Sequence, residues 1–408
     1  MNNECEIIHL SNGIRAVLQK TQSSVVYCGL TIGTGTANEL ADEQGIAHFI
    51  EHVLFKGTKK RSARDICYGL EHNGGELNAF TSRESTIVYS IVQNSQFEKA
   101  LEIICDLVFN STFPETELNR EKGVIISEIN SSKCNLSEVI YDKSMQLLFK
   151  GNAIGKPILG TIKSVKSFTA DNVRTFVKRN YINRRIVLSV VGNIDTDKLN
   201  LLANKYLMKY NNDSDIVQCE KISEYKPFKK EFQSDSAQAF CIISNRAYNI
   251  SDSRSTGLSL LTNMLGGPIF SSLLNLSLRE QNGLVYDISS SYEAYTSSGV
   301  FQIYFETARK NLKKSIKLAL AELENLRSGK INKSDLDYAK KRFIGQLVIQ
   351  NENYEQRMID NAKMLLMFDK IETIDIQKSK INALKSEDLY KIANDIFVEN
   401  NLSFISYS

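Results

Sequence analysis

The sequence predicts an α+β protein with two similar halves, each a sheet rich in antiparallel strands with helices packed on it in a sandwich-like arrangement. Three observations support this fold class. Strand-like and helical patterns both occur in the first half, their order recurs after a polar segment near the middle, and 408 residues suffice for two or three domains of roughly 150 residues.

The first half begins with a hairpin. A strand-like run from about Cys5 continues through the turn Ser11-Asn12-Gly13 into a second strand at 14–19. The remaining elements follow from apolar periodicity. We expect strands at 25–32, 76–81, 85–93 and 185–191, and helices at 43–56, 62–72, 95–110, 114–133, 137–150, 169–181 and 195–210.

A polar and charged segment at 211–230 is typical of an interdomain linker. We therefore expect a first domain at 1–210 and a second, homologous domain at 231–408. The second domain repeats the order of elements in the first. We expect strands at 238–244 and 284–306, helices at 253–265, 309–327 and 333–366, and a final helix and strand.

The recurring order indicates an internal duplication. An amphipathic helix followed by a strand also matches itself by chance, because apolar periodicity is a weak discriminator. We favour duplication, and the motif at 48–52 does not depend on this choice. A shift of 216 residues aligns the ends of the two halves without a gap: Val173 with Leu389, Phe176 with Ile392, Tyr181 with Phe397, Ile182 with Val398 and Leu188 with Phe404.

The composition is that of a folded protein, with 42% hydrophobic residues, 24% charged residues and four prolines. A net charge of +3 predicts no non-specific nucleic-acid binding. Seven cysteines without a CxxC pair predict neither a disulfide framework nor a cysteine zinc cluster, and they fit a reducing compartment. Because neither a signal-peptide pattern nor about 18 consecutive apolar residues occur, we expect a cytoplasmic protein with no membrane partner.

Two of the four histidines lie in His48-Phe49-Ile50-Glu51-His52, within a stretch of helical pattern. Residues four apart stack on one helical face about 6 Å apart, so both imidazoles can reach one metal ion, and Glu51 lies on the same side. Neutral imidazole binds zinc, and a nearby carboxylate can take a proton from a bound water whose pKa is about 7. A buried helix with hydrogen-bonded histidines is the alternative, which five residues alone do not exclude.

A catalytic zinc keeps three protein ligands and an open position, so a third ligand is required. Glu121 and Glu128 lie seven residues apart in a helical pattern and therefore share a face. One of them can bind the metal while the other orients it. Two solvated glutamates on an amphipathic helix are the alternative.

The run HFIEHVLFKGT at 48–58 resembles the signature of the pitrilysin/insulinase family of inverted zinc peptidases, in the branch of mitochondrial processing peptidase and its bacterial relatives. Further matches are GGELNAFTSRE at 74–84 and LREQNGLVY at 278–286, and the similarity covers essentially the whole chain. The resemblance implies one zinc ion per chain. It implies His48, His52 and Glu128 as the zinc ligands, Glu51 as general base and Glu121 as the supporting carboxylate.

In this family, the segment matching 77–81 is an edge strand that bound substrate extends through main-chain hydrogen bonds. The resemblance thus implies Asn78, Ala79 and Phe80 as substrate-binding residues, with peptides as substrates. An ordinary amphipathic strand is the alternative.

Arg279 and Tyr286 match a family pair that contacts the substrate carbonyl, so both would donate hydrogen bonds to the oxyanion of the reaction. The loop at 266–274 departs from the family, because a third glycine and an arginine after the serines are absent from it. This loop is therefore expected to bind substrate differently.

Family members work as a four-domain clamshell, whereas this chain supplies two such domains. The resemblance therefore implies half of a clamshell and a homodimer, or a heterodimer with a related subunit. We hypothesise that Arg279 and Tyr286 of one subunit reach the zinc of the other, and action in cis is the alternative.

The leading functional hypothesis is a zinc metalloendopeptidase that hydrolyses peptides or unstructured protein segments inside a closed chamber. Glu51 would activate the attacking water. A non-catalytic scaffold subunit is the second hypothesis, against which the intact motif argues. A dedicated protease that trims leader peptides together with a paired subunit is the third.

Overall fold

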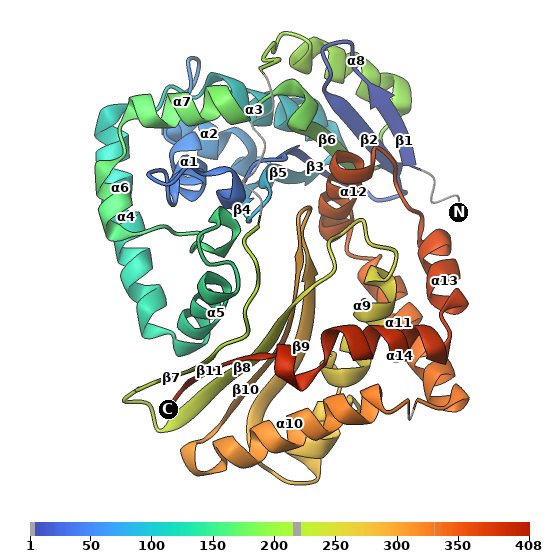
Figure 1. Cartoon of the computed structure of the whole chain (residues 1–408). Coiled ribbons are helices and arrows are strands. Elements are labelled where there is room, and N and C mark those ends of the chain that lie inside the picture. Colours follow the sequence, from blue (N-terminus) through green and yellow to red (C-terminus); the bar gives the residue numbers. More distant parts are fainter. Residues whose placement is uncertain (1–4, 215–221, 330) are drawn as a thin grey trace. The chain divides into compact units, whose positions relative to one another are not determined.

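The computed structural model describes residues 5–214, 222–329 and 331–408, which form two compact units (Figure 1). The first unit comprises Met1–Ser131, Lys156–Glu220 and Gln350–Thr373. The second comprises Ser132–Gly155, Lys221–Ile349 and Ile374–Ser408. Each unit therefore contains segments from both halves of the sequence.

The sheet of the first unit consists of β1 (Cys5–His9), β2 (Arg15–Lys20), β3 (Val25–Ile32), β4 (Glu76–Thr81), β5 (Thr86–Gln93) and β6 (Ile186–Gly192). The strands lie in the order β1-β2-β6-β3-β5-β4. Only the pair β2 and β6 runs parallel within this described sheet, and the other neighbours are antiparallel. The strand β4 therefore forms one edge of the sheet.

The sheet of the second unit consists of β7 (Lys229–Phe232), β8 (Gln238–Ala247), β9 (Val285–Ala294), β10 (Gly299–Ala308) and β11 (Ser403–Tyr407). Its order is β7-β11-β8-β10-β9, with β7 and β11 parallel and the other neighbours antiparallel. The chain order, spatial order and direction of these five strands match those of β2 to β6. The predicted recurrence of elements is confirmed, and so is the mixed α/β fold class with two sheets.

The helices repeat in the same way. The first half contains α1 (Ile46–Leu54), α2 (Ala63–Glu71), α3 (Phe97–Asn110), α4 (Glu115–Cys134), α5 (Leu136–Leu148), α6 (Ile162–Ser167), α7 (Ala170–Asn180) and α8 (Thr196–Leu207). The second half contains α9 (Ser255–Gly266), α10 (Leu312–Arg327), α11 (Lys333–Gln350), α12 (Tyr354–Phe368), α13 (Ile374–Ala383) and α14 (Ser386–Ile396). In order along the chain, α3 to α7 correspond to α10 to α14.

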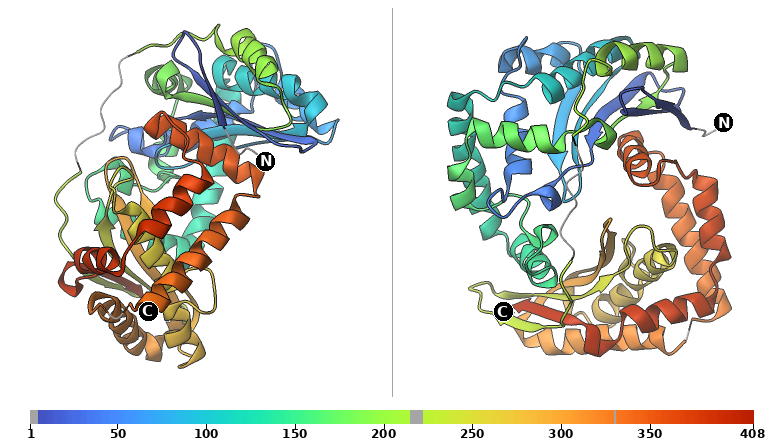
Figure 2. Two further views of the ribbon diagram at one scale, coloured as in Figure 1. Left: turned by 90° about the vertical axis from the view of Figure 1, so that its right-hand side faces the viewer. Right: turned by 45° about the horizontal axis from the view of Figure 1, so that its top comes forward.

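The corresponding helices α5 and α12 are exchanged between the units. Helix α12 packs on the first sheet, where Leu365 lies in a buried cluster with Val17 of β2 and Val187 of β6. Helix α5 packs on the second sheet, where Ile140 clusters with Ile242 of β8. Both views of Figure 2 show the orange-red α12 beside the blue strands of the first sheet. The expected domains at 1–210 and 231–408 do not include this exchange.

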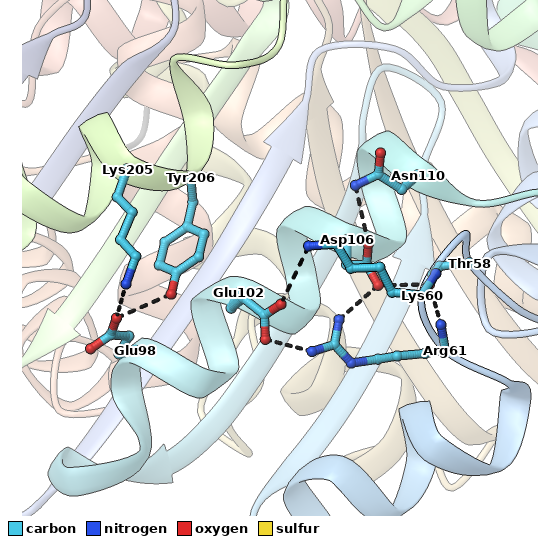
Figure 3. Close-up of polar contacts among 9 residues, drawn as sticks. All are labelled: Thr58, Lys60, Arg61, Glu98, Glu102, Asp106, Asn110, Lys205 and Tyr206. Carbon is cyan, nitrogen blue, oxygen red and sulfur yellow. Dashed lines mark hydrogen bonds and ion pairs between the residues drawn. The ribbon is translucent and has the colours of Figure 1, made fainter.

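The first sheet is covered on both faces. Along β2, Ala16 and Leu18 belong to the main core with α1, α3, α7 and α8, whereas Val17 points to the opposite face and α12. This alternation is the period of two expected for a strand. Polar contacts also join the helices of the main core, because Glu98 of α3 accepts hydrogen bonds from Lys205 and Tyr206 of α8 (Figure 3).

Local capping determines where several helices begin. The Thr169 hydroxyl accepts a hydrogen bond from the Asn172 amide at the start of α7, and the Asn172 side chain accepts one from the Thr169 amide. The Asn353 side chain caps α12 by accepting from the Gln356 amide. The continuous helix predicted at 333–366 is therefore wrong, because this cap divides it into α11 and α12.

Other boundaries also differ from the prediction. The expected final helix is two helices, α13 and α14, and β7 begins within the expected linker at 211–230. The central part of that linker, 215–221, lies outside the described residues. None of the helices in the described parts of the chain combines the length and apolar character that a membrane span requires.

Candidate metal centre

Helix α1 carries the histidine motif and is held firmly at its start. Gly45 adopts a φ of +89°, and a Cβ there would lie 2.6 Å from the Cα of Gly160. The side-chain carboxyl group of buried Glu39 accepts hydrogen bonds from the amides of Gly45 at 2.9 Å and Ala47 at 3.0 Å. These bonds satisfy amide groups that a helix N-terminus leaves unpaired. The residue before His48 is thereby fixed.

The apolar face of α1 fixes the direction of the histidines. Phe49 and Ile50 are fully buried in the main core of the first unit. His48 and His52 lie on another face with their ring centroids 4.7 Å apart. Both imidazoles therefore point to the same region, as the spacing of four residues predicts.

Glu128 of α4 completes a cluster of three donors. One carboxylate oxygen lies 3.7 Å from His48 Nε2, and the other lies 3.6 Å from His52 Nε2. One ligand atom from each of the three residues lies within 4.8 Å of the other two. The structure thus brings together the three side chains predicted to bind metal.

The chemistry and spacing of these donors fit zinc. Bonds of about 2.0–2.1 Å to a common tetrahedral ion would place two ligand atoms about 3.4 Å apart, close to the measured 3.6 and 3.7 Å. Burial, and then the neighbouring His52, lower the pKa of His48 to about 4. The His48 imidazole is therefore neutral at pH 7, which is the form that binds a metal.

Glu121 lies on α4 two helical turns before Glu128 and is 6% exposed. Its Oε2 lies 3.2 Å from His52 Nδ1, and its Oε1 lies 2.8 Å from the ammonium group of Lys56. A ligating histidine is usually oriented by a hydrogen bond from its other ring nitrogen to a carboxylate or carbonyl. Glu121 is in the position to provide that bond.

Glu51 lies on α1 between the two histidines and next to the end of β4. Its Oε2 is buried and, among the described residues, has no hydrogen-bond partner. Burial raises the pKa of the Glu51 carboxyl, while a hydrogen bond from Thr81 and the electrostatic influence of nearby His52 oppose that rise. A carboxyl group with an unpaired oxygen beside the three donor side chains is in a position to accept a proton.

The strand β4 is an edge strand, as predicted for 77–81. Leu77 and Ala79 pack against the main core, Phe80 packs with the cluster on the opposite face, and Asn78 is exposed. Its last residue, Thr81, lies beside Glu51. The free edge of β4 therefore ends beside Glu51, with Asn78, Ala79 and Phe80 along it.

Arg279 and Tyr286 belong to the second unit. Arg279 lies in a π-helical turn at Asn275–Glu280, and Tyr286 lies on β9 with 61% of its surface exposed. The Arg279 guanidinium lies 5.5 Å from the ring centroid of Phe270, which is itself 70% exposed. Phe270 belongs to the loop at 266–274 that departs from the family pattern.

The sequence predicts no role for three residues that cap α1 or contact Glu51 and Glu121. Glu39 and Thr81 give no sequence signal, because their partners lie in other elements. Lys56 belongs to the motif at 48–58, and its position four residues after His52 is the one signal that it lies close to the cluster.

The sequence profile of insulinase (peptidase family M16) matches residues 15–162, and the profile of the peptidase M16 inactive domain matches residues 167–343. The uncharacterized zinc protease YmxG of Bacillus subtilis is 32% identical over 390 residues, which cover 95% of each chain. The chain belongs to the insulinase family, peptidase family M16. The predicted family resemblance is confirmed.

Further relatives of this M16 chain agree. An uncharacterized zinc protease of Rickettsia felis is 32% identical over 97% of this chain and 96% of its own. The β subunit of mitochondrial-processing peptidase from Bos taurus is 36% identical over 200 residues, 49% of this chain and 41% of that subunit. The relatives named as zinc proteases support peptidase chemistry for the chain.

Two solved structures share the fold. A protease from Helicobacter pylori superposes with a TM-score of 0.93 at 20% identity, covering 100% of both chains. A peptidase M16 inactive domain from Pseudomonas fluorescens has a TM-score of 0.91 at 17% identity, covering 99% of this chain and 97% of its own. At such identities the likeness concerns the fold alone.

Proposed function

We propose that this M16 chain is a zinc-dependent endopeptidase that hydrolyses peptides or unstructured protein segments. One observation carries the proposal: the nitrogen and oxygen donors of His48, His52 and Glu128 converge within 4.8 Å, and Glu51 lies next to them with a buried, unpaired oxygen among the described residues. A scaffold role would require none of these groups. The His/His/Glu donor set supports one zinc ion per chain.

The residues of the first unit would divide the chemistry between them. A zinc ion bound by His48, His52 and Glu128 would supply Lewis acidity and lower the pKa of a bound water to about 7. Glu51 takes a proton from the attacking water and later gives it to the leaving amine. Glu121 keeps the His52 ring in its orientation through the contact at Nδ1.

Substrate would bind along the edge of β4. An extended peptide that pairs with this edge receives main-chain hydrogen bonds regardless of its sequence. Asn78 presents an exposed side chain to it, and Thr81 leads to Glu51. Such binding selects for extended chains, which supports peptides or unstructured segments as substrates in preference to folded domains.

Arg279 and Tyr286 would donate hydrogen bonds to the developing oxyanion. We propose that the chain works as a dimer enclosing a chamber, and that this pair acts on the metal centre of the other subunit. Mixing inactive Glu51→Gln subunits with inactive Tyr286→Phe subunits tests the point. Activity should return in verified mixed dimers, and its absence there would favour action in cis.

A second candidate function is the processing of leader peptides together with a related subunit. The similarity to a protein named as the β subunit of a processing peptidase favours it. Co-purification of the tagged chain with a second M16 chain would support this candidate, whereas full activity of the isolated homodimer would argue against it. The cysteine pattern supports a cytoplasmic location for either function.

The decisive experiment compares wild-type protein with Glu51→Gln on a library of quenched peptides, with zinc measured in both. We expect about one zinc per chain in both proteins and a loss of cleavage of at least about 100-fold in the variant. A matched control is Glu98→Gln, an acidic residue of α3 that contacts Lys205 and Tyr206 of α8. Cleavage retained by Glu51→Gln would remove Glu51 as the base, and zinc-free wild-type protein would overturn the proposal.

A further inference from the structure

Lys56 lies just beyond the end of α1 and contacts the second carboxylate of the site. Its ammonium group is 2.8 Å from Glu121 Oε1, while Glu121 Oε2 is 3.2 Å from His52 Nδ1. The two oxygens of Glu121 are thus divided between the lysine and the histidine. Side-chain exposure is 28% for Lys56 and 9% for Glu121, so water competes little for the carboxylate.

We infer that Lys56 is a positioning residue for the metal centre, an inference that rests on the proposed zinc site. By holding one oxygen of Glu121, Lys56 turns the other oxygen toward His52 Nδ1. In the His52 tautomer that carries its proton on Nδ1, this nitrogen donates a hydrogen bond to the Glu121 oxygen. His52 Nε2 then keeps its lone pair, and this nitrogen is the one that lies 3.6 Å from Glu128.

The backbone that carries Lys56 is itself fixed. The Lys56 amide donates to Val53 at the end of α1, and the Thr58 amide donates to the Arg61 carbonyl. The Thr58 hydroxyl and the Arg61 guanidinium both donate to Oδ2 of buried Asp106 on α3, at 2.6 and 2.7 Å (Figure 3). These charge-assisted bonds attach the loop at 56–62 to α3. The backbone position from which the Lys56 side chain extends to Glu121 is therefore fixed.

The charge of Lys56 matters as well as its position. Burying an ionised carboxylate without a cationic partner is costly, and a buried charge that loses its partner rearranges or destabilises its surroundings. In this site the lysine is the cation in contact with Glu121 among the described residues. Its removal should therefore disturb the orientation of Glu121 first and that of His52 second.

The test measures zinc affinity of the metal-free protein by competition with a chelating indicator, so it does not depend on peptidase activity. Outer-shell partners of metal ligands typically contribute 10- to 100-fold to affinity. We expect Lys56→Met to bind zinc about tenfold more weakly than wild type. Lys60→Met is the matched control, because the Lys60 side chain is 66% exposed and lies 4.0 Å from Glu102, away from the cluster. Its zinc affinity should be unchanged.

A double-mutant cycle shows whether Lys56 acts through Glu121. In a Glu121→Gln background, Lys56→Met should change zinc affinity less than about twofold. An equal effect in both backgrounds would overturn the inference, and so would wild-type affinity in Lys56→Met. If Lys56→Met does not fold, Lys56→Gln replaces it, because glutamine keeps a donor and removes the charge.

The outcomes separate this inference from the proposed function. Wild-type protein that binds no zinc overturns both. Wild-type protein that binds zinc no more tightly than Lys56→Met overturns only the role of Lys56. If Lys56→Met weakens zinc binding only where Glu121 is present, the result supports both the zinc site and the role of Lys56.

Discussion

The two units share the order of five strands but differ in the helix that follows β3 in one and β8 in the other. In the first unit, α1 carries His48 and His52 toward Glu128 of α4. In the second unit, α9 carries no histidine, and Asn263 donates a hydrogen bond of 2.7 Å to Gln346 of α11. Helices α4 and α11 begin at residues 115 and 333, so the difference of 218 places Gln346 opposite Glu128 and Ala339 opposite Glu121.

This comparison shows that the fold alone does not make the site. The same pair of helices is joined by a neutral amide contact in one unit and presents three metal donors in the other. Substitutions on this shared framework therefore decide whether a unit can bind metal. The insulinase profile, at residues 15–162, contains His48, His52 and Glu128, whereas the inactive-domain profile, at residues 167–343, contains α9.

Among these predictions, removal of a metal-binding side chain from the first unit should have the largest effect. We expect His52→Ala to weaken zinc binding by more than about 100-fold, above the range for outer-shell partners, and to abolish cleavage. The matched variant Asn263→Ala, at the helix contact of the second unit, should leave zinc affinity within about twofold. Chelator competition measures both. A comparable loss in Asn263→Ala would contradict the assignment of the site to the first unit.

The exchanged helices allow the units to be destabilised separately. Leu365 of α12 and Ile140 of α5 are fully buried on the first and second sheets. Each substitution by alanine should cost about 2–5 kcal/mol of unfolding free energy. Hydrogen exchange should rise mainly in β2 and β6 for Leu365→Ala, and in β8 and β11 for Ile140→Ala. The reverse pattern would contradict the exchange.

The cap of α1 should give a smaller and pH-dependent effect. Glu39→Gln leaves one of two buried amides without its acceptor, at a cost of about 1–3 kcal/mol. Burial raises the pKa of Glu39 from 4.5 to about 8. Between these pH values the folded state binds more protons at this carboxyl than the unfolded state does. The contribution of the Glu39 carboxyl to folding stability is therefore fully present below pH 4.5 and is lost as the pH rises through 8.

Urea unfolding of both metal-free proteins from pH 5 to 8 measures this dependence. The stability of wild type relative to Glu39→Gln should fall as the pH rises, with a slope of at most about 1.4 kcal/mol per pH unit. A relative stability that increases with pH would contradict the raised pKa.

The sequence predicts those parts of the site that depend on spacing within one helix. His48 and His52 are four residues apart, and Glu121 and Glu128 are seven apart, so helical geometry alone places each pair on one face. The spacing of four residues between His52 and Lys56 indicates that Lys56 lies near the cluster, but local periodicity does not show that its partner is Glu121 on another helix.

The same limit explains the errors in the fold. The amphipathic patterns of α5 and α12 predict that each helix buries one face, but not which sheet receives that face. The break between α11 and α12 had a local signal in Asn353 and Gln356, which the apolar periodicity at 333–366 concealed. The two-part α/β class was predictable because hydrophobic alternation and the repeated order of elements specify it.

The most direct test of the account is an anomalous difference map at the zinc absorption edge from crystals of the zinc-loaded protein. We predict one strong peak within about 2.0–2.2 Å of His48 Nε2, His52 Nε2 and a Glu128 oxygen, and none between α9 and α11. A peak between α9 and α11, or a zinc ion bound away from these three donors, would contradict the assignment of metal chemistry to the first unit.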